Sequence, residues 1–444
     1  MPLIPPSPRR SRVLGAAAAL TAAVALLAAC SSAGGASHPT APGSASVNTT
    51  TASGSLLVWT DATRQPYAQA YADSHPSVHV TIVTLDMSTL DTKLQLLART
   101  KSKWPDVIFT PNGEGTKLHD TVGYSADLSS YVGAQTKAGF GSTLTACTEG
   151  AGLYCLPGDI STQMLWYNAT LMKQFGYTVP TTWAEYQALA EKVATEHPGY
   201  VVGSCGDGFC PNVYYRSSGC DGETLTGVKD VTVNLSGKAC ARVTDMLDPL
   251  VADGTVAKLS PFDPDFAKLG SANKILMLPG FVWYGALLFQ QTFKNPAGEI
   301  AAAPLPTWPD GAKGLGAAVG GQWLVSSASA NTGSAVNMIE WETTNSANLA
   351  GQTTFPAYQP AAAAWAAKAI STGFYASDPT SVITQARADV TGNLFTPTGF
   401  DILTPFANAV APALKSGKTL SSQIGAWQAS VVQGAKDAGY SATS

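Results

Sequence analysis

Between residues 55 and 109, apolar strand-like runs alternate with helical segments. The runs 55–60, 78–83 and 104–109 have the length and pattern of strands. Helical segments over 64–72 and 88–99 separate them. A strand–helix–strand–helix–strand order predicts a parallel sheet with crossover helices, so the sequence predicts an α/β fold.

Polar residues follow the first and third of these runs. Thr60 and Asp61 come at the end of the first run, and Asn112 comes shortly after the third. In open α/β sheets, ligands bind beyond the carboxyl ends of the strands. We therefore expect these three residues at a ligand-binding edge.

The remainder of the chain repeats the alternation of strands and helices. Thr182 with Glu185 predicts a capped helix start. The expected strands are 163–168, 298–305 and 321–325, and the expected helices are 184–194, 335–341 and 420–438.

Composition limits the possible classes of function. The 444 residues are 45% hydrophobic and only 13% charged, with a formal net charge of -4. This supports buried cores in two domains. Nucleic-acid binding requires a basic patch, and no Lys/Arg cluster follows the N-terminal segment, which excludes that class.

The N-terminus has the parts of a secretory signal peptide. Arg9, Arg10 and Arg12 precede an uncharged apolar stretch over 13–29. A membrane-spanning helix is the alternative, but it requires about 20 apolar residues, and this stretch is shorter. The pair Arg9-Arg10 leaves twin-arginine export open.

The end of that stretch, Leu27-Ala28-Ala29-Cys30, resembles a bacterial lipobox. The resemblance implies cleavage of residues 1–29, attachment of lipid (diacylglycerol and palmitate) to Cys30, and anchoring at the extracytoplasmic face of the cell membrane. An ordinary signal peptide is the alternative. Residues 30–54, rich in Ser, Ala, Gly and Thr, are expected to form a flexible tether, so only the lipid touches the membrane.

Six cysteines remain once Cys30 is assigned to the lipid. An even number in an exported chain indicates disulfides. Proximity pairs them as Cys147 with Cys155, Cys205 with Cys210, and Cys220 with Cys240. A metal site is the alternative, but the five histidines show no metal-ligand spacing to these cysteines, so we expect neither a metal nor a cofactor.

An ordered series of short motifs resembles the extracellular solute-binding proteins of ABC importers, in the branch that includes maltose-type sugar binders. The series covers most of the chain after residue 55. The matching stretches are 56–60, 104–107, 156–159, 165–168, 179–183, 280–283, 303–306 and 320–323.

The resemblance implies a two-lobed fold of the periplasmic-binding-protein type (type II), whose lobes are joined by hinge crossovers. Lobe 1 would comprise 55–158 and 305–354, and lobe 2 would comprise 159–304 and 355–444. It further implies a monomer that is not an enzyme. This protein would close on a carbohydrate and deliver it to an ABC permease and its ATPase.

The resemblance also implies ligand contacts. A sugar would use polar side chains for its hydroxyls and aromatic faces for its C–H surface. Phe281-Val282 departs from the Gly-Pro that many relatives have before the tryptophan. The implied contacts are Thr60, Asp61, Asn112, Asp159, Trp283, Tyr284, Gln322, Trp323 and Tyr358.

Three alternatives remain open. Tyr214-Tyr215 resembles the tandem phenolates of ferric-ion binders, and Asp61 with Asp159 could serve a polyamine. A secreted cell-surface enzyme is the third. Ser271 and Lys274 fit Ser-x-x-Lys, but the partner motifs Ser-Asp-Asn and Lys-Thr-Gly are missing.

Overall fold

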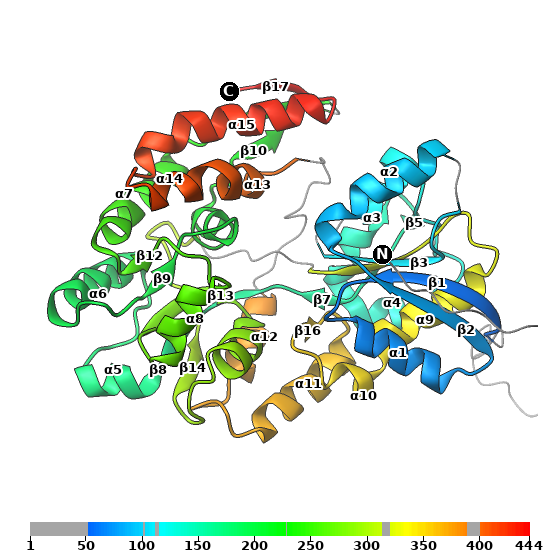
Figure 1. Ribbon diagram of the computed structural model, residues 1–444, viewed down its shortest axis with the longest axis horizontal. Coiled ribbons are helices and arrows are strands. Elements are labelled where there is room, and N and C mark those ends of the chain that lie inside the picture. Colours follow the sequence, from blue (N-terminus) through cyan, green and yellow to red (C-terminus); the bar gives the residue numbers. More distant parts are fainter. Residues whose placement is uncertain (1–51, 101–102, 112–114, 228, 313–319, 389–399) are drawn as a thin grey trace, which may run out of the picture. The chain divides into compact units, whose positions relative to one another are not determined.

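The computed structural model describes residues 52–100, 103–111, 115–227, 229–312, 320–388 and 400–444 (Figure 1). The expected signal peptide, Cys30, nearly all of the tether and Asn112 lie outside these residues. Within the described part of the chain, no helix is both long and apolar enough to cross a membrane.

A five-stranded sheet in the order β2-β1-β3-β15-β6 forms the first half of the molecule. Its strand β1 pairs in parallel with both β2 and β3, as the alternating pattern predicted, while β15 runs antiparallel to β3. The elements assembled on this sheet are β1 (Gly54–Thr60), α1 (Gln65–Ser74), β2 (Val78–Thr84), α2 (Leu90–Thr100), β3 (Val107–Thr110), α3 (Gly115–Val122), α4 (Ala134–Phe140), the hairpin β4 (Thr148–Glu149) and β5 (Gly152–Leu153), β6 (Leu156–Pro157), β15 (Gln322–Val325) and α9 (Thr332–Thr344).

Helices cover both faces of this sheet. Figure 1 shows α1 and α9 on one side and α2 and α3 on the other. Leu90 and Leu94, four residues apart on α2, are both buried, because residues at this spacing lie on one helix face. Strand β3 is buried along its whole length and mostly apolar, which is typical of a strand in a parallel sheet that is covered on both sides.

The second half of the molecule is built around the antiparallel sheet β13-β8-β14. The capping box of Thr182 and Glu185 is present at the start of α6 and confirms that prediction. The elements are β7 (Asp159–Ile160), β8 (Gln163–Asn168), α5 (Ala169–Phe175), α6 (Trp183–Glu196), β9 (Gly203–Ser204), β10 (Glu223–Leu225), β11 (Asp230–Val233), α7 (Lys238–Asp253), β12 (Val256–Ala257), α8 (Pro264–Ser271), β13 (Met277–Phe281), β14 (Ile300–Ala303), β16 (Phe355–Pro356), α12 (Thr380–Ala388), α13 (Leu403–Pro405), α14 (Ala411–Lys415), α15 (Ile424–Asp437) and β17 (Ser441–Thr443). Helices α10 (Ser346–Leu349) and α11 (Gln359–Ser371) pack on each other, and they contact α9 and α4 of the first half.

Three parallel segments of this half end at a common edge. Strand β12 pairs in parallel with β9, and a parallel bridge joins Val201 to Ile275, at the start of the segment that continues as β13. The chain leaves these segments as loops beginning at residues 205, 258 and 282. The three loops therefore meet at one edge, which is where ligands bind in α/β folds.

A short antiparallel pair ties two of the expected crossovers together. Strand β7 pairs with β16, and Asp159 lies opposite Pro356 in that pair. The crossovers expected near Asp159 and near Phe355-Pro356 are thus hydrogen-bonded neighbours. The residue boundaries of the two lobes remain a prediction.

The disulfide pairing expected from proximity is confirmed. Cys147 bonds Cys155, Cys205 bonds Cys210, and Cys220 bonds Cys240. These bonds close loops with sequence separations of 8, 5 and 20. Short loops restrict the unfolded chain less than long ones, so we expect their main effect on local geometry.

One carboxyl group is buried in the first half without a partner. Glu342, on α9, is 1% exposed, and neither of its carboxyl oxygens has a hydrogen-bond partner among the described residues. Burial raises the pKa of Glu342 to about 8. The side chain therefore holds its proton at neutral pH, because a bare carboxylate there would lose its hydration.

Glu342 should make stability fall as the pH rises. Between an unfolded pKa of roughly 4.3 and the folded value of about 8, the native state binds one more proton than the unfolded state. The stabilisation that Glu342 contributes is therefore fully present below the unfolded pKa. It falls by about 1.4 kcal/mol per pH unit above that pKa, until the pH reaches the folded pKa. We expect Glu342→Gln to become more stable relative to the wild type from pH 5 to pH 8, measured by urea unfolding.

The matched control is Glu191→Gln, which makes the same substitution at an exposed position on α6. Its stability relative to the wild type should change little over the same range. A Glu342→Gln variant that tracks the wild type at every pH would contradict the assignment.

Candidate ligand-binding site

The turn between β1 and α1 carries a pair of opposite charges. The backbone N–H of Arg64 donates to Asp61 Oδ1 at 2.8 Å, and its Nη1 donates to Asp61 Oδ2 at 2.8 Å. The guanidinium carbon lies 4.1 Å from the centre of the Phe109 ring. This contact with an aromatic face fixes the plane of the guanidinium.

The same guanidinium reaches the first crossover. Arg64 Nη2 donates to Asp159 Oδ2, and the Gly321 N–H donates to Asp159 Oδ1 at 2.8 Å. A Cβ at Gly320 would overlap Asp159 Oδ1, so only glycine fits there. The Asp159 carboxylate, on a residue only 3% exposed, thus joins the β1–α1 turn, the start of β15 and the β7–β16 pair.

The charges of this cluster support one another. Burial by itself lowers the pKa of Arg64, but the negative charges of Asp159 and Asp61 outweigh it, and the pKa is raised overall. Both carboxylates are thereby compensated in a site with little water. Sequence analysis missed Arg64, although it is the only Lys or Arg between residues 55 and 92, which is a usable signal.

Three expected contacts in this half are buried. Thr60 and Gln322 are fully buried and Trp323 is 2% exposed. Gln322 Oε1 accepts from the Gly115 N–H at 2.7 Å and its Nε2 donates to the Ala146 carbonyl at 3.3 Å. The amide therefore holds the start of α3 in this conformation, next to the segment that contains the expected contact Asn112.

Aromatic residues follow β13 in the other half. Trp283 is half-buried. It lies parallel to Phe281, at 2° and 5.4 Å between ring centres. Tyr284 is 1% exposed, and its ring occupies the space above Gly280 where a Cβ would stand. Trp283 thus offers surface to a ligand, and Tyr284 supports the turn that carries it.

Tyr358 precedes α11, just after the β7–β16 pair. It is half-buried, and its ring meets Phe140 of α4 edge-on at 5.1 Å. The structure therefore brings Asp61 and Asp159 together through Arg64. It places Trp283 and Tyr284 in a second, aromatic group.

The alternatives to a sugar ligand find little support in the geometry. Tyr214 and Tyr215 are buried, and their hydroxyls lie at hydrogen-bond distance from those of Tyr186 and Thr244, so both phenols already have polar partners within the protein. Lys274, the lysine of the Ser-x-x-Lys string, places its ammonium over the Tyr200 ring at 4.0 Å.

The two carboxylates that could serve a polyamine, Asp61 and Asp159, already pair with Arg64. Among the residues described, no three His, Cys, Asp or Glu cluster to hold a metal ion.

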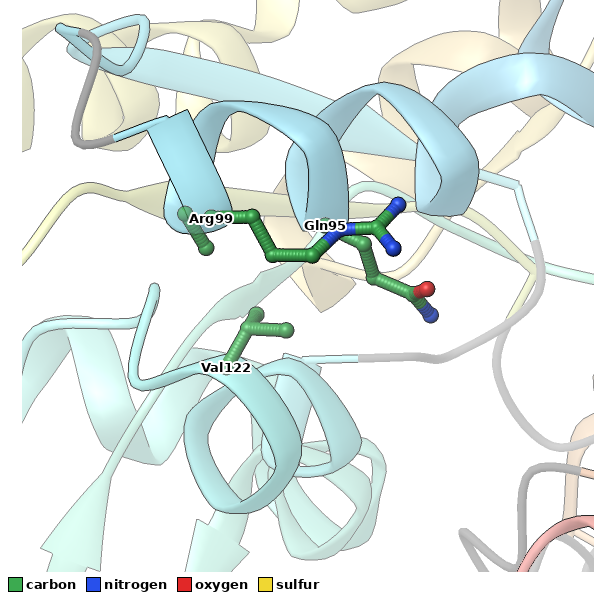
Figure 2. A pocket seen from close by; sticks show the side chains of 4 residues that line it. Gln95, Arg99 and Val122 are labelled. Atoms are coloured by element: carbon green, nitrogen blue, oxygen red, sulfur yellow. The ribbon is translucent and has the colours of Figure 1, made fainter.

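A hollow of about 450 Å³ lies between α2 and α3 (Figure 2). Gln95, Ala98 and Arg99 of α2 and Val122 of α3 line it. Val122 is the last residue of α3, whereas Gly115 at the start of that helix contacts Gln322. The hollow therefore lies at the opposite end of α3 from the expected contacts.

The family of the chain follows from its sequence. The profile of a family described as bacterial extracellular solute-binding protein matches residues 58–349. The protein belongs to this family. The resemblance drawn from the motifs is confirmed, and this family consists of solute-binding proteins. No curated protein matches the sequence.

Solved structures of solute-binding proteins share the fold of this one. The galacto-N-biose-/lacto-N-biose I-binding protein of an ABC transporter from Bifidobacterium longum has a TM-score of 0.73 and 19% identity, covering 88% of this chain and 99% of its own. A binding protein from B. animalis subsp. lactis, in complex with β-1,6-galactobiose, has a TM-score of 0.70 and 21% identity, covering 88% and 99%.

A third structure supports the same fold. The GacH receptor of Streptomyces glaucescens, solved with and without acarbose, has a TM-score of 0.68 and 20% identity, covering 87% and 99%. The solute-binding protein described here therefore has the two-lobed α/β fold that the motifs implied.

Removing Arg64 should destabilise the protein. Arg64→Ala leaves the buried Asp159 carboxylate without its cation, so we expect a loss of about 3–5 kcal/mol in the free energy of unfolding, measured by urea unfolding at neutral pH. Arg64→Lys keeps the charge but cannot bridge two carboxylates as a planar fork, and should lose less. An Arg64→Ala variant as stable as the wild type would show that the cluster contributes nothing.

Proposed function

We propose that this solute-binding protein is the lipid-anchored extracellular component of an ABC importer, and that it captures a sugar or oligosaccharide. The observation that carries the proposal is Trp283, a partly exposed ring at the edge where three parallel segments end. An aromatic face with a few fixed polar groups is the usual composition of a small-molecule site. Named ligands of the structural relatives, which are lacto-N-biose, β-1,6-galactobiose and acarbose, support a saccharide.

The proposed contacts divide by exposure. Asp61, Trp283 and Tyr358 retain exposed surface, so we assign them to direct contact with the ligand. The assignment of Asn112, outside the described residues, rests on its place after β3. The buried members of the expected set position these contacts, namely Thr60, Asp159, Tyr284, Gln322 and Trp323.

The two lobes would close on the ligand if the ligand contacts both of them. A ligand stabilises the closed state only by the difference in its affinity for the two states. Asp61 directly follows β1 of the first sheet, and Trp283 follows β13 of the second. A sugar held by both groups would bias closure, and the closed form would dock onto the permease and its ATPase.

Saccharide binding should depend on Trp283. In a thermal-shift screen of mono- and oligosaccharides, a saccharide present at about 100 times its dissociation constant should add about 2.7 kcal/mol of stability. Trp283→Ala should lose most of this gain, because it removes the ring that covers the C–H face of the sugar.

The matched control is Trp341→Ala, which removes a partly buried tryptophan that contacts Tyr71 of α1 and His75, the residue after α1. This variant should be less stable but should keep the full ligand-induced shift. A shift given only by ferric citrate or a polyamine would keep the fold and overturn the proposed ligand class.

Anchoring at the membrane should depend on Cys30. Cys30→Ser removes the sulfur that would carry the lipid, so we expect the protein in the culture medium or as unprocessed precursor, with no lipid detected by mass spectrometry. Cys147→Ser, which removes a disulfide cysteine instead, should leave lipid attachment intact. A Cys30→Ser variant that still carries lipid would contradict the anchor.

A further inference from the structure

Two phenylalanines extend the aromatic surface beyond Trp283. Phe209 and Phe262 each lie 5.9 Å from Trp283 between ring centres, and 5.8 Å from one another. We call these three residues the aromatic triangle. Phe262 is 45% exposed, and the other two are half-buried. Contiguous apolar surface that stays in contact with water is typical of a binding site.

The two loops that carry the phenylalanines are packed together at their backbones. Ser204 Oγ donates to the Leu259 carbonyl at 2.6 Å, and the Cys205 N–H donates to the Ala257 carbonyl at 2.8 Å. A Cβ at Gly206 would overlap the backbone of Leu259 and Ser260, so only glycine allows this approach. The two loops therefore hold a fixed relative position.

The loop that carries Phe209 is fixed by covalent and polar contacts. The Cys205–Cys210 disulfide closes it. Inside it, Asp207 accepts from the Phe209 N–H at 2.9 Å and from Ser260 Oγ. Gln163 Nε2 of β8 donates to the Asn212 carbonyl at 2.8 Å, just after the disulfide. These contacts hold Phe209 against Phe281 and Trp283 and leave little freedom to its backbone.

Covering the exposed part of the triangle would be favourable. Aromatic rings gain free energy when they are covered, at roughly 25 cal/mol per Å² of apolar surface, and the Phe262 ring keeps nearly half of its surface in water. Rigid rings that remain uncovered lose little conformational entropy on binding, which favours ligand affinity. The geometry points to a pre-organised surface that the ligand itself covers.

We propose that the aromatic triangle is a second saccharide subsite, so that the ligand has at least two sugar rings and Phe262 sets its preference for oligosaccharides over monosaccharides. This rests on the proposed function. One ring stacks on Trp283, and the next lies along Phe262 and Phe209. The three ring centres lie about 6 Å apart, so Phe209 and Phe262 place two further rings beside the one that Trp283 offers.

Isothermal titration of the purified protein with mono- and oligosaccharides tests this subsite. The panel includes galactose, glucose, lacto-N-biose, β-1,6-galactobiose and acarbose. We expect the wild type to bind one of the oligosaccharides more tightly than any monosaccharide. Phe262→Ala should weaken that ligand by about tenfold or more and leave monosaccharide affinity nearly unchanged, and Phe262→Trp should restore the preference.

Two further variants separate the subsite from folding. Tyr131→Ala removes an equally exposed ring, at 49%, from the other half and should change no affinity. The double variant Cys205→Ser, Cys210→Ser should weaken the oligosaccharide in the same way as Phe262→Ala, with unchanged circular dichroism.

The outcomes distinguish this inference from the proposed function. Equal affinity for mono- and oligosaccharides, or a Phe262→Ala variant with unchanged oligosaccharide affinity, overturns the second subsite while saccharide binding stands. Binding of no saccharide at all overturns both. Oligosaccharide preference that disappears only with Phe262→Ala and the disulfide variant supports both.

Discussion

The buried carboxylate of Asp159 joins parts of the chain that are far apart in sequence. It accepts from Arg64 in the β1–α1 turn and from Gly321 at the start of β15, and its own strand pairs with β16. A buried charge of this kind is costly unless every lone pair is satisfied. The turn, the glycine pair and the crossover must therefore adopt their positions together, and the first sheet is fixed to the crossovers by this requirement.

The two halves present different chemistry. Around the first sheet, polar groups such as Asp61 and Gln322 are held by charge pairing and by backbone hydrogen bonds. Around the second, the surface is aromatic and is fixed by a disulfide and a close backbone approach. A sugar has both kinds of surface, hydroxyl groups at its rim and C–H groups on its faces. The division suits a ligand that must touch both halves before it is held.

Much of the fold could be predicted from local patterns. The parallel arrangement of β1, β2 and β3 follows from the strand–helix alternation, and the capped start of α6 from Thr182 and Glu185. Pairing of the cysteines by proximity was also correct. Element ends were less accurate: the strand expected over 298–305 spans Ile300–Ala303, because strand length depends on its partner in the sheet.

The sequence by itself determined the fold class, the family and the disulfides, because hydrophobic period, ordered motifs and cysteine spacing are local properties of the chain. Only the tertiary structure decided which polar and aromatic residues are exposed. Arg64 was missed because its role depends on Asp159, 95 residues away. Phe262 was missed because its importance comes from Trp283 and Phe209, which other loops bring to it. Burial and contact arise from long-range packing, which no local pattern encodes.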